Sequence, residues 1–142
     1  MGKKFSRHDA RKEAFKLIFE LNQHKDELDF LFDNLLLEHP EAESSMPYIK
    51  AVVTGSLNCY DELIEIISEN LAKGWTIDRI SKPSRAILIL AIYEIKYADD
   101  VPQKVAINEA VELAKEFDEP SAAAFVNGVL SGVIKNEPLS RG

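Results

Sequence analysis

Apolar residues recur every three or four positions along almost the whole chain. The first stripe predicts a helix over residues 7–23, with Ala10, Ala14, Leu17, Ile18 and Leu21 on its buried face. The second predicts a helix over residues 26–38 that ends at His39-Pro40, because the residue before a proline avoids helical backbone. No stretch shows the sustained alternation of apolar and polar residues that a strand requires. The pattern therefore predicts an all-α protein.

The middle of the chain carries the longest stripe. Between residues 47 and 73 the apolar residues share one face for seven turns, which predicts one long helix with a bend at Gly55. Gly74 is expected to end this helix, because glycine readily adopts the left-handed conformation of a C-terminal cap. Residues 76–81 should then form a single turn.

Polar residues and prolines indicate where the last three helices begin. Ser81 can cap a fifth helix, whose second residue, Pro83, needs no backbone N–H at that position. Residues 86–93 are apolar all round, which predicts that this helix lies at the centre of the protein. Residues 100–103 approximate a capping box for a sixth helix, and the seventh is expected to open near Pro120.

The seven helical elements are expected to form one domain of two packed sub-bundles. No linker or repeat divides residues 1–142, and disorder is expected only at residues 1–5 and 137–142. The longest apolar run, residues 86–93, is far shorter than the roughly 20 residues that cross a bilayer. The N-terminus also lacks the apolar stretch of a signal peptide. We therefore expect a cytoplasmic protein without a membrane partner.

Side chains suited to catalysis do not form a recognisable arrangement. The histidines lie near predicted helix ends, without a second ligand three or four residues away. Cys59 is the only cysteine and flanks the stripe of the long helix, where a packed small side chain is a simpler interpretation than a nucleophile. The chain has no phosphate-binding glycine loop. We expect no catalytic residue, no metal and no cofactor.

The charge is concentrated at one end. The net charge is −7, yet residues 1–16 hold six Lys or Arg and two acidic residues, so the other 126 residues carry −11. The helix dipole disfavours cations at a helix start, so local stability does not explain Lys3, Lys4 and Arg7. Bound phosphate would explain them, because helix N–H groups and cations converge on one anion. A merely solvated basic surface is the alternative interpretation.

The C-terminal third resembles a known family. Residues 101–115, VPQKVAINEAVELAK, and residues 125–130, FVNGVL, are similar to the signature of bacterial NusB transcription antitermination factors. The similarity extends to residues 85–94 and to the opening Ser6-Arg7 with Ala10-Arg11. This resemblance implies a seven-helix fold of two perpendicular bundles, no enzymatic activity, and a role in antitermination on ribosomal RNA operons.

The resemblance also implies partners and site residues. The expected partners are boxA single-stranded RNA, the ribosomal small-subunit protein NusE and the RNA polymerase antitermination complex. The residues carried over to the RNA site are Lys4, Arg7, His8, Arg11, Lys16, Phe125 and Asn127. The candidates for the NusE contact are Arg85, Tyr93 and Glu94.

Several of these residues have a second interpretation. Phe125 fits the inner stripe of its helix, so it is either a core residue or a ring beside RNA. Asn127 is either an RNA contact or part of a helix-packing hydrogen bond. The outer acidic stripe either complements a basic partner protein or is simply solvated, and it consists of Glu109, Glu112 and Glu116.

The sequence departs from the family pattern at two places. His8 and Asp9 stand where members are often basic, and residues 121–124 replace a frequent polar pair, so RNA binding by this chain alone is expected to be weak. A protein–protein module of the same fold, such as a homodimer without RNA affinity, is therefore the alternative function. A domain that guides an RNA-modifying enzyme is a third, more distant, alternative.

Overall fold

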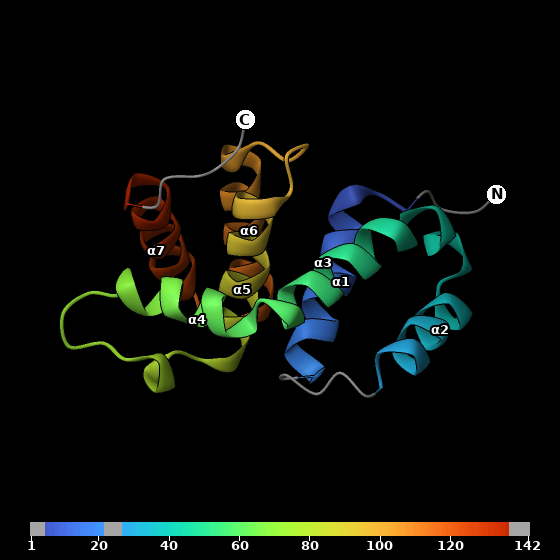
Figure 1. The fold of residues 1–142 in the computed structure, drawn as a ribbon, viewed down its shortest axis with the longest axis horizontal. Coiled ribbons are helices and arrows are strands. Elements are labelled where there is room, and N and C mark those ends of the chain that lie inside the picture. The colour runs from blue at the N-terminus through green and yellow to red at the C-terminus, as the bar shows by residue number, and fades with distance from the viewer. Residues whose placement is uncertain (1–4, 22–26, 137–142) are drawn as a thin grey trace.

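The computed structural model describes residues 5–21 and 27–136, and within them the chain is helical without strands (Figure 1). The prediction of an all-α fold is confirmed. The α-helices are α1 (Arg7–Leu21), α2 (Leu28–Glu38), α3 (Met46–Asn58), α4 (Tyr60–Glu69), α5 (Lys82–Tyr97), α6 (Gln103–Phe117) and α7 (Ala122–Asn136). Two short 3₁₀ helices are η1 (Pro40–Ser45) and η2 (Ile77–Arg79). In this part of the chain no helix is long and apolar enough to span a membrane.

Figure 1 shows two groups of helices, with α1, α2 and α3 in one half and α4 to α7 in the other. Helix α5 packs against helices of both groups, namely α1 and α3 on one side and α4, α6 and α7 on the other. The predicted division into two sub-bundles is confirmed. The two sub-bundles are connected by the packing of α5 against both of them and by the junction between α3 and α4. Disorder was predicted for residues 1–5 and 137–142, and apart from Phe5 these residues, including Lys4, lie outside the described ranges.

Helix α5 is the core of the protein. All residues from Ala86 to Ile92 are buried, and Ile87, Leu88 and Ile92 have almost no exposed surface. Burying one such side chain contributes about 1.5–3 kcal/mol, so this helix dominates the hydrophobic stabilisation. The expectation that the all-apolar helix occupies the centre is confirmed.

The prediction of one long helix over residues 47–73 was wrong. Helix α3 ends at Asn58 and α4 starts at Tyr60, and the break lies at Cys59 rather than at Gly55. Both pieces pack on α5, so their apolar stripe continues across the break and the periodicity does not reveal it. Gly55 is instead a site of close approach, because a Cβ there would lie 2.2 Å from the hydroxyl oxygen of Tyr93.

The ends of the later helices differ in how they are capped. Gly74 has the left-handed φ of 93° expected of a helix-stop glycine, although α4 already ends at Glu69. Ser81 caps α5 as predicted, accepting a hydrogen bond from the backbone N–H of Ser84 at 3.2 Å. Helix α6 has no side-chain cap, so the predicted capping box was wrong: Pro102 occupies the cap position and has no side-chain acceptor.

Asp118 fastens the start of α5 to the turn between α6 and α7. Its Oδ2 accepts hydrogen bonds from the hydroxyls of Ser81 at 2.5 Å and Ser84 at 2.6 Å. Its Oδ1 accepts one from the backbone N–H of Glu119 at 2.7 Å. Partial burial alone would raise the pKa of Asp118, but the hydrogen bonds from Ser81 and Ser84 outweigh it and hold that pKa below its usual value.

Asp118→Ala should lower the free energy of unfolding by about 1–3 kcal/mol at pH 7, because it leaves the Ser81 and Ser84 hydroxyls without their acceptor. A depressed carboxyl pKa stabilises the fold above the unfolded value of about 3.9 and ceases to do so as pH falls through the folded value. Urea denaturation at pH 7 and pH 2.5 measures both effects. The control is Glu119→Ala, an exposed neighbour. A difference between wild type and Asp118→Ala that stays constant at both pH values would contradict this role.

Candidate nucleic-acid interface

Arg11 lies in the interior between α1, α5 and α6. Its side chain is 4% exposed and forms a two-pronged ion pair with Glu94, which is 0% exposed. Nε lies 2.8 Å from Glu94 Oε1 and Nη2 lies 3.0 Å from Oε2. Nη1 donates to Glu109 Oε1 at 3.1 Å. Burial alone would lower the pKa of Arg11, but the hydrogen bonds and charge of Glu94 raise it overall, so the guanidinium is always charged.

This geometry gives Arg11 and Glu94 an internal role instead of the surface roles predicted for them. The sequence assigned Arg11 to RNA phosphate and Glu94 to NusE, whereas the two side chains bind each other in the core. Their charges require this arrangement, because an ion buried without a partner costs several kcal/mol.

The other basic residues of α1 lie largely beside carboxylates. His8 Nδ1 lies 2.8 Å from Glu109 Oε1, Lys12 Nζ lies 2.8 Å from Glu116 Oε2, and Lys16 Nζ lies 3.4 Å from Glu13 Oε2. The hydrogen bond to Glu116 raises the pKa of Lys12. Glu109 and Glu116 of the acidic stripe on α6 therefore contact side chains of α1. The local excess of positive charge is smaller than the sequence suggested.

Arg7 is the exception on α1. It is exposed, and its guanidinium carbon lies 4.2 Å from the centre of the Tyr48 ring. No carboxylate of the described ranges lies within 4 Å of it. The ring holds the side chain in place without neutralising it, so Arg7 remains able to bind phosphate.

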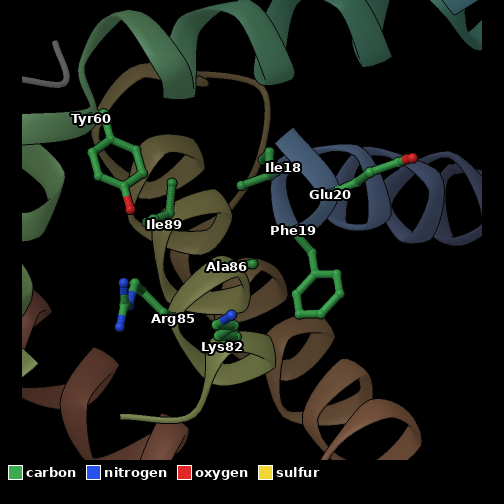
Figure 2. A pocket seen from close by; sticks show the side chains of 8 residues that line it. All are labelled: Ile18, Phe19, Glu20, Tyr60, Lys82, Arg85, Ala86 and Ile89. Atoms are coloured by element: carbon green, nitrogen blue, oxygen red, sulfur yellow. The ribbon is translucent and has the colours of Figure 1, made fainter. Parts of the chain in front are cut away.

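A second group of cations lies at the start of α5. A hollow of about 370 Å³ opens between α1, α4 and α5. Figure 2 shows the side chains that line it, which are Ile18, Phe19, Glu20, Tyr60, Lys82, Arg85, Ala86 and Ile89. Lys82 is exposed, and the Nε of Arg85 is buried without a hydrogen-bond partner among the described residues. Neither cation has a carboxylate within 4 Å in that part of the chain. This hollow can accept an anion.

The sequence contained a signal for this group. Lys82 and Arg85 stand in the first turn of α5, where the helix dipole disfavours cations. Bound phosphate would explain the cations that the helix dipole disfavours at the start of α1, and the same reasoning applies to Lys82 and Arg85. Lys82 was missed, and Arg85 was assigned only to a protein partner.

The surroundings of Phe125 are compatible with both interpretations of this residue. It packs against the hydrophobic core, but it is only partly buried, and its ring centre lies 5.6 Å from that of Trp75. Asn127 is exposed on α7. No hydrogen bond of its side chain is found within residues 5–21 and 27–136, so the packing alternative has no partner there.

The structure does not gather the predicted RNA residues into one pocket. Arg7 and His8 line a hollow beside the α5–α6 connection, together with Asp100. Phe125 lies beyond the opposite end of α5, because the α6–α7 turn is fastened to Ser81. Helix α1 runs from the hollow lined by Arg7 to the hollow lined by Phe19. These two residues are twelve positions apart, which corresponds to about 18 Å along the helix. Lys16 lies between them. A ligand that contacts both ends must therefore be elongated.

The NusE candidates are also divided. Arg85 and Tyr93 lie two helical turns apart on one face of α5, which looks toward α3 and α4. Tyr93 is partly exposed, and its ring centre lies 5.2 Å from that of Tyr97. Glu94 points into the core instead. Only the first two remain available on the surface.

Comparison with known sequences matches the chain to one family. The sequence profile of the NusB family matches residues 8–135. The chain is 46% identical to the transcription antitermination protein NusB of Pediococcus pentosaceus over 132 residues, which cover 92% of this chain and 98% of the relative. It is 43% identical to the NusB protein of Oceanobacillus iheyensis over 129 residues, with 91% and 98% covered.

Solved structures share the fold. NusB of T. maritima superposes with a TM-score of 0.83 at 29% identity, covering 94% of both chains. A crystal structure of antitermination factors NusB and NusE in complex with dsRNA gives a TM-score of 0.75 at 26% identity, covering 91% of this chain and 96% of the other. The fold agrees over nearly the full length of the chains compared.

Arg11→Ala should lower the free energy of unfolding by about 3–5 kcal/mol, because it leaves the carboxylate of Glu94 buried without its partner. Arg7→Ala is the matched control on the same helix, and it should cost about 1 kcal/mol or less, since it removes only an exposed cation–π contact. Urea denaturation measures both. The double variant Arg11→Met, Glu94→Leu should regain much of the loss. Equal destabilisation by the two single arginine variants would contradict the buried role of Arg11.

Proposed function

The chain belongs to the NusB family, and we propose that it acts in transcription antitermination by binding boxA-type single-stranded RNA across α1 and the start of α5. The hollow at the start of α5 carries this proposal, because Lys82 and Arg85 line it and neither forms an ion pair within 4 Å among the described residues. Glu20 lines the hollow as well, so the two cations outnumber its carboxylate. Two cationic side chains without an ion pair can bind phosphate together. We also propose that this protein has no catalytic activity.

The separation of the sites suits an elongated nucleic acid. Arg7 and the hollow lie about 18 Å apart along α1. Nucleotides of a stacked strand are spaced by roughly 3.4 Å, so about five or six of them span this distance. Lys12 and Lys16 lie along the way, with Nζ atoms 5.9 and 6.0 Å from the Phe117 ring centre. RNA would compete there with the carboxylates of Glu116 and Glu13, whose surface pairs are weak.

NusE and the RNA polymerase antitermination complex are the proposed protein partners. The similar crystal structure contains NusB, NusE and dsRNA together. On this chain we propose that NusE contacts the C-terminal half of α5, where Tyr93 and Tyr97 leave aromatic surface accessible, whereas Arg85 at the start of α5 contacts the RNA. Aromatic side chains are enriched at protein interfaces, which supports this choice.

One observation favours the alternative of a protein–protein module, for example a homodimer. The cations of α1 are engaged by carboxylates of α1 and α6, which reduces their attraction for RNA. Helix α2 also exposes Phe30 by 68% and Leu37 by 79%, so a second copy would find apolar surface there. Under this alternative the protein binds NusE or itself, but not RNA.

Wild-type protein should bind a fluorescently labelled boxA-type single-stranded RNA, with a slope of log K against log salt of roughly −2 to −3.5 for three to five phosphate contacts. Fluorescence anisotropy at several salt concentrations measures this slope. Addition of NusE should strengthen the binding. Retention of NusE without any retention of RNA at low salt would refute the RNA proposal and support the protein–protein module.

Lys82→Gln should weaken RNA binding several-fold and reduce the magnitude of the salt slope by about 0.7, because one phosphate contact is lost. Arg7→Gln is expected to have the same effect at the other end of the site. Lys135→Gln is the matched control, since this exposed lysine lies in the last turn of α7, away from the hollow. If the control weakens binding as much as Lys82→Gln does, the hollow is not the RNA site.

A further inference from the structure

Trp75 is the only tryptophan of the chain, and it stands in the loop between α4 and α5. Its side chain is 44% exposed. The ring of Phe125 lies 5.6 Å from it, tilted by 39°, and the guanidinium carbon of Arg79 lies 5.2 Å from the centre of the indole ring. Three side chains from two distant segments thus form one cluster, in which the guanidinium of Arg79 lies over the indole ring of Trp75 and the ring of Phe125 lies beside it. Because Trp75 is 44% exposed, part of the indole remains open to a ligand.

The loop holds this cluster in a fixed place. The backbone N–H of Trp75 donates to the carbonyl of Ala72 at 3.0 Å, and Nη1 of Arg79 donates to the carbonyl of Gly74 at 3.2 Å. Ile80 is 4% exposed and anchors the end of η2 in the core. A preorganised aromatic surface loses little conformational entropy when a ligand binds it.

The surroundings of the cluster are cationic. Asp78 lies next to Arg79 and near Arg85, and its pKa is held below the usual value by the Thr76 hydroxyl first and by these two arginines in addition. Arg85 lines the hollow at the start of α5. Arg79 ends η2 three residues before Lys82 begins α5, so the cluster lies next to the end of α5 that carries the proposed phosphate site. Two arginines face one carboxylate here.

We propose that Trp75 and Phe125 form a stacking platform for one base of bound single-stranded RNA, and that Arg79 contacts the phosphate of the same nucleotide. This proposal rests on the RNA-binding function proposed above. Every base has a flat π-face, so aromatic rings beside cations hold single strands with little dependence on sequence. The platform extends the RNA path beyond the hollow, from α5 to α7.

The tryptophan itself reports on this platform. Titration of the wild-type protein with an unlabelled boxA-type RNA should change the emission of Trp75 in a saturable way, because a base stacked on indole quenches or shifts its fluorescence. The midpoint should equal that of the anisotropy titration with labelled RNA. Since the chain contains a single tryptophan, the signal needs no correction for others.

Trp75→Leu should weaken RNA binding by about 5- to 150-fold, the range that corresponds to loss of one base–aromatic stack. Trp75→Phe should retain much of the affinity, because a ring remains. Phe30→Leu is the matched control, as it removes an exposed aromatic residue on the remote helix α2. Trp75→Leu should leave the salt slope unchanged, whereas Arg79→Gln should reduce its magnitude by about 0.7. If Trp75 had only a structural role, Trp75→Leu would disturb the neighbouring cations and change the salt slope as well as the affinity.

The outcomes distinguish this proposal from the one on which it rests. If wild-type protein binds RNA but Trp75 emission stays constant and Trp75→Leu binds normally, the platform is refuted and the RNA-binding function stands. If wild-type protein does not bind RNA, both are refuted. Should Trp75→Leu fail to fold, the emission of wild-type protein and the affinity of Arg79→Gln, an exposed position, still decide the question.

Discussion

The buried ion pair between Arg11 and Glu94 constrains the arrangement of the whole protein. It joins α1 of one sub-bundle to α5, the central helix, at a point where both side chains are almost fully enclosed. An interior charge tolerates little displacement of its partner, because the loss of a hydrogen bond there is not compensated by water. The pair therefore fixes the rotation of α1. With Arg11 turned inward, Arg7 and Lys16 lie on exposed parts of the same helix.

The cations of α1 consequently fall into three energetic groups. Arg11 cannot be withdrawn from Glu94 without a large penalty, so it belongs to the fold. Lys12 and Lys16 form surface pairs worth less than about 1 kcal/mol, which phosphate can exchange at little cost. Arg7 rests on Tyr48 and keeps its charge available. An acidic protein can thus carry a basic surface on α1 whose cations differ in how readily they leave their present partners.

The sequence predicted the start of α5 well, because the hydroxyl of Ser81 caps it as expected. Gly74 has the left-handed φ expected of it, but the preceding helix already ends at Glu69. The sequence did not predict the break at Cys59, because both neighbouring helices bury the same stripe against α5. It also placed Arg11 on the surface, because the periodicity of apolar residues predicts which apolar side chains are buried but does not reveal a buried charge. One signal was available: Glu94 follows directly on the all-apolar run of α5, and a carboxylate in that position requires a cation nearby. The Trp75–Phe125 contact joins residues 50 positions apart and has no local signal.

The burial of α5 determines where a ligand can bind. The middle of this helix is enclosed, so only its ends reach the surface, and its N-terminal end carries the positive pole of the helix dipole. Asp118 already accepts hydrogen bonds from Ser81 and Ser84 at that end, and its negative charge opposes a second anion on the backbone N–H groups. A phosphate at this end must therefore be held by side chains that reach past Asp118. In the proposed RNA site Lys82 and Arg85 are these side chains, and phosphate binding would account for two cations in a helical turn whose dipole alone disfavours them.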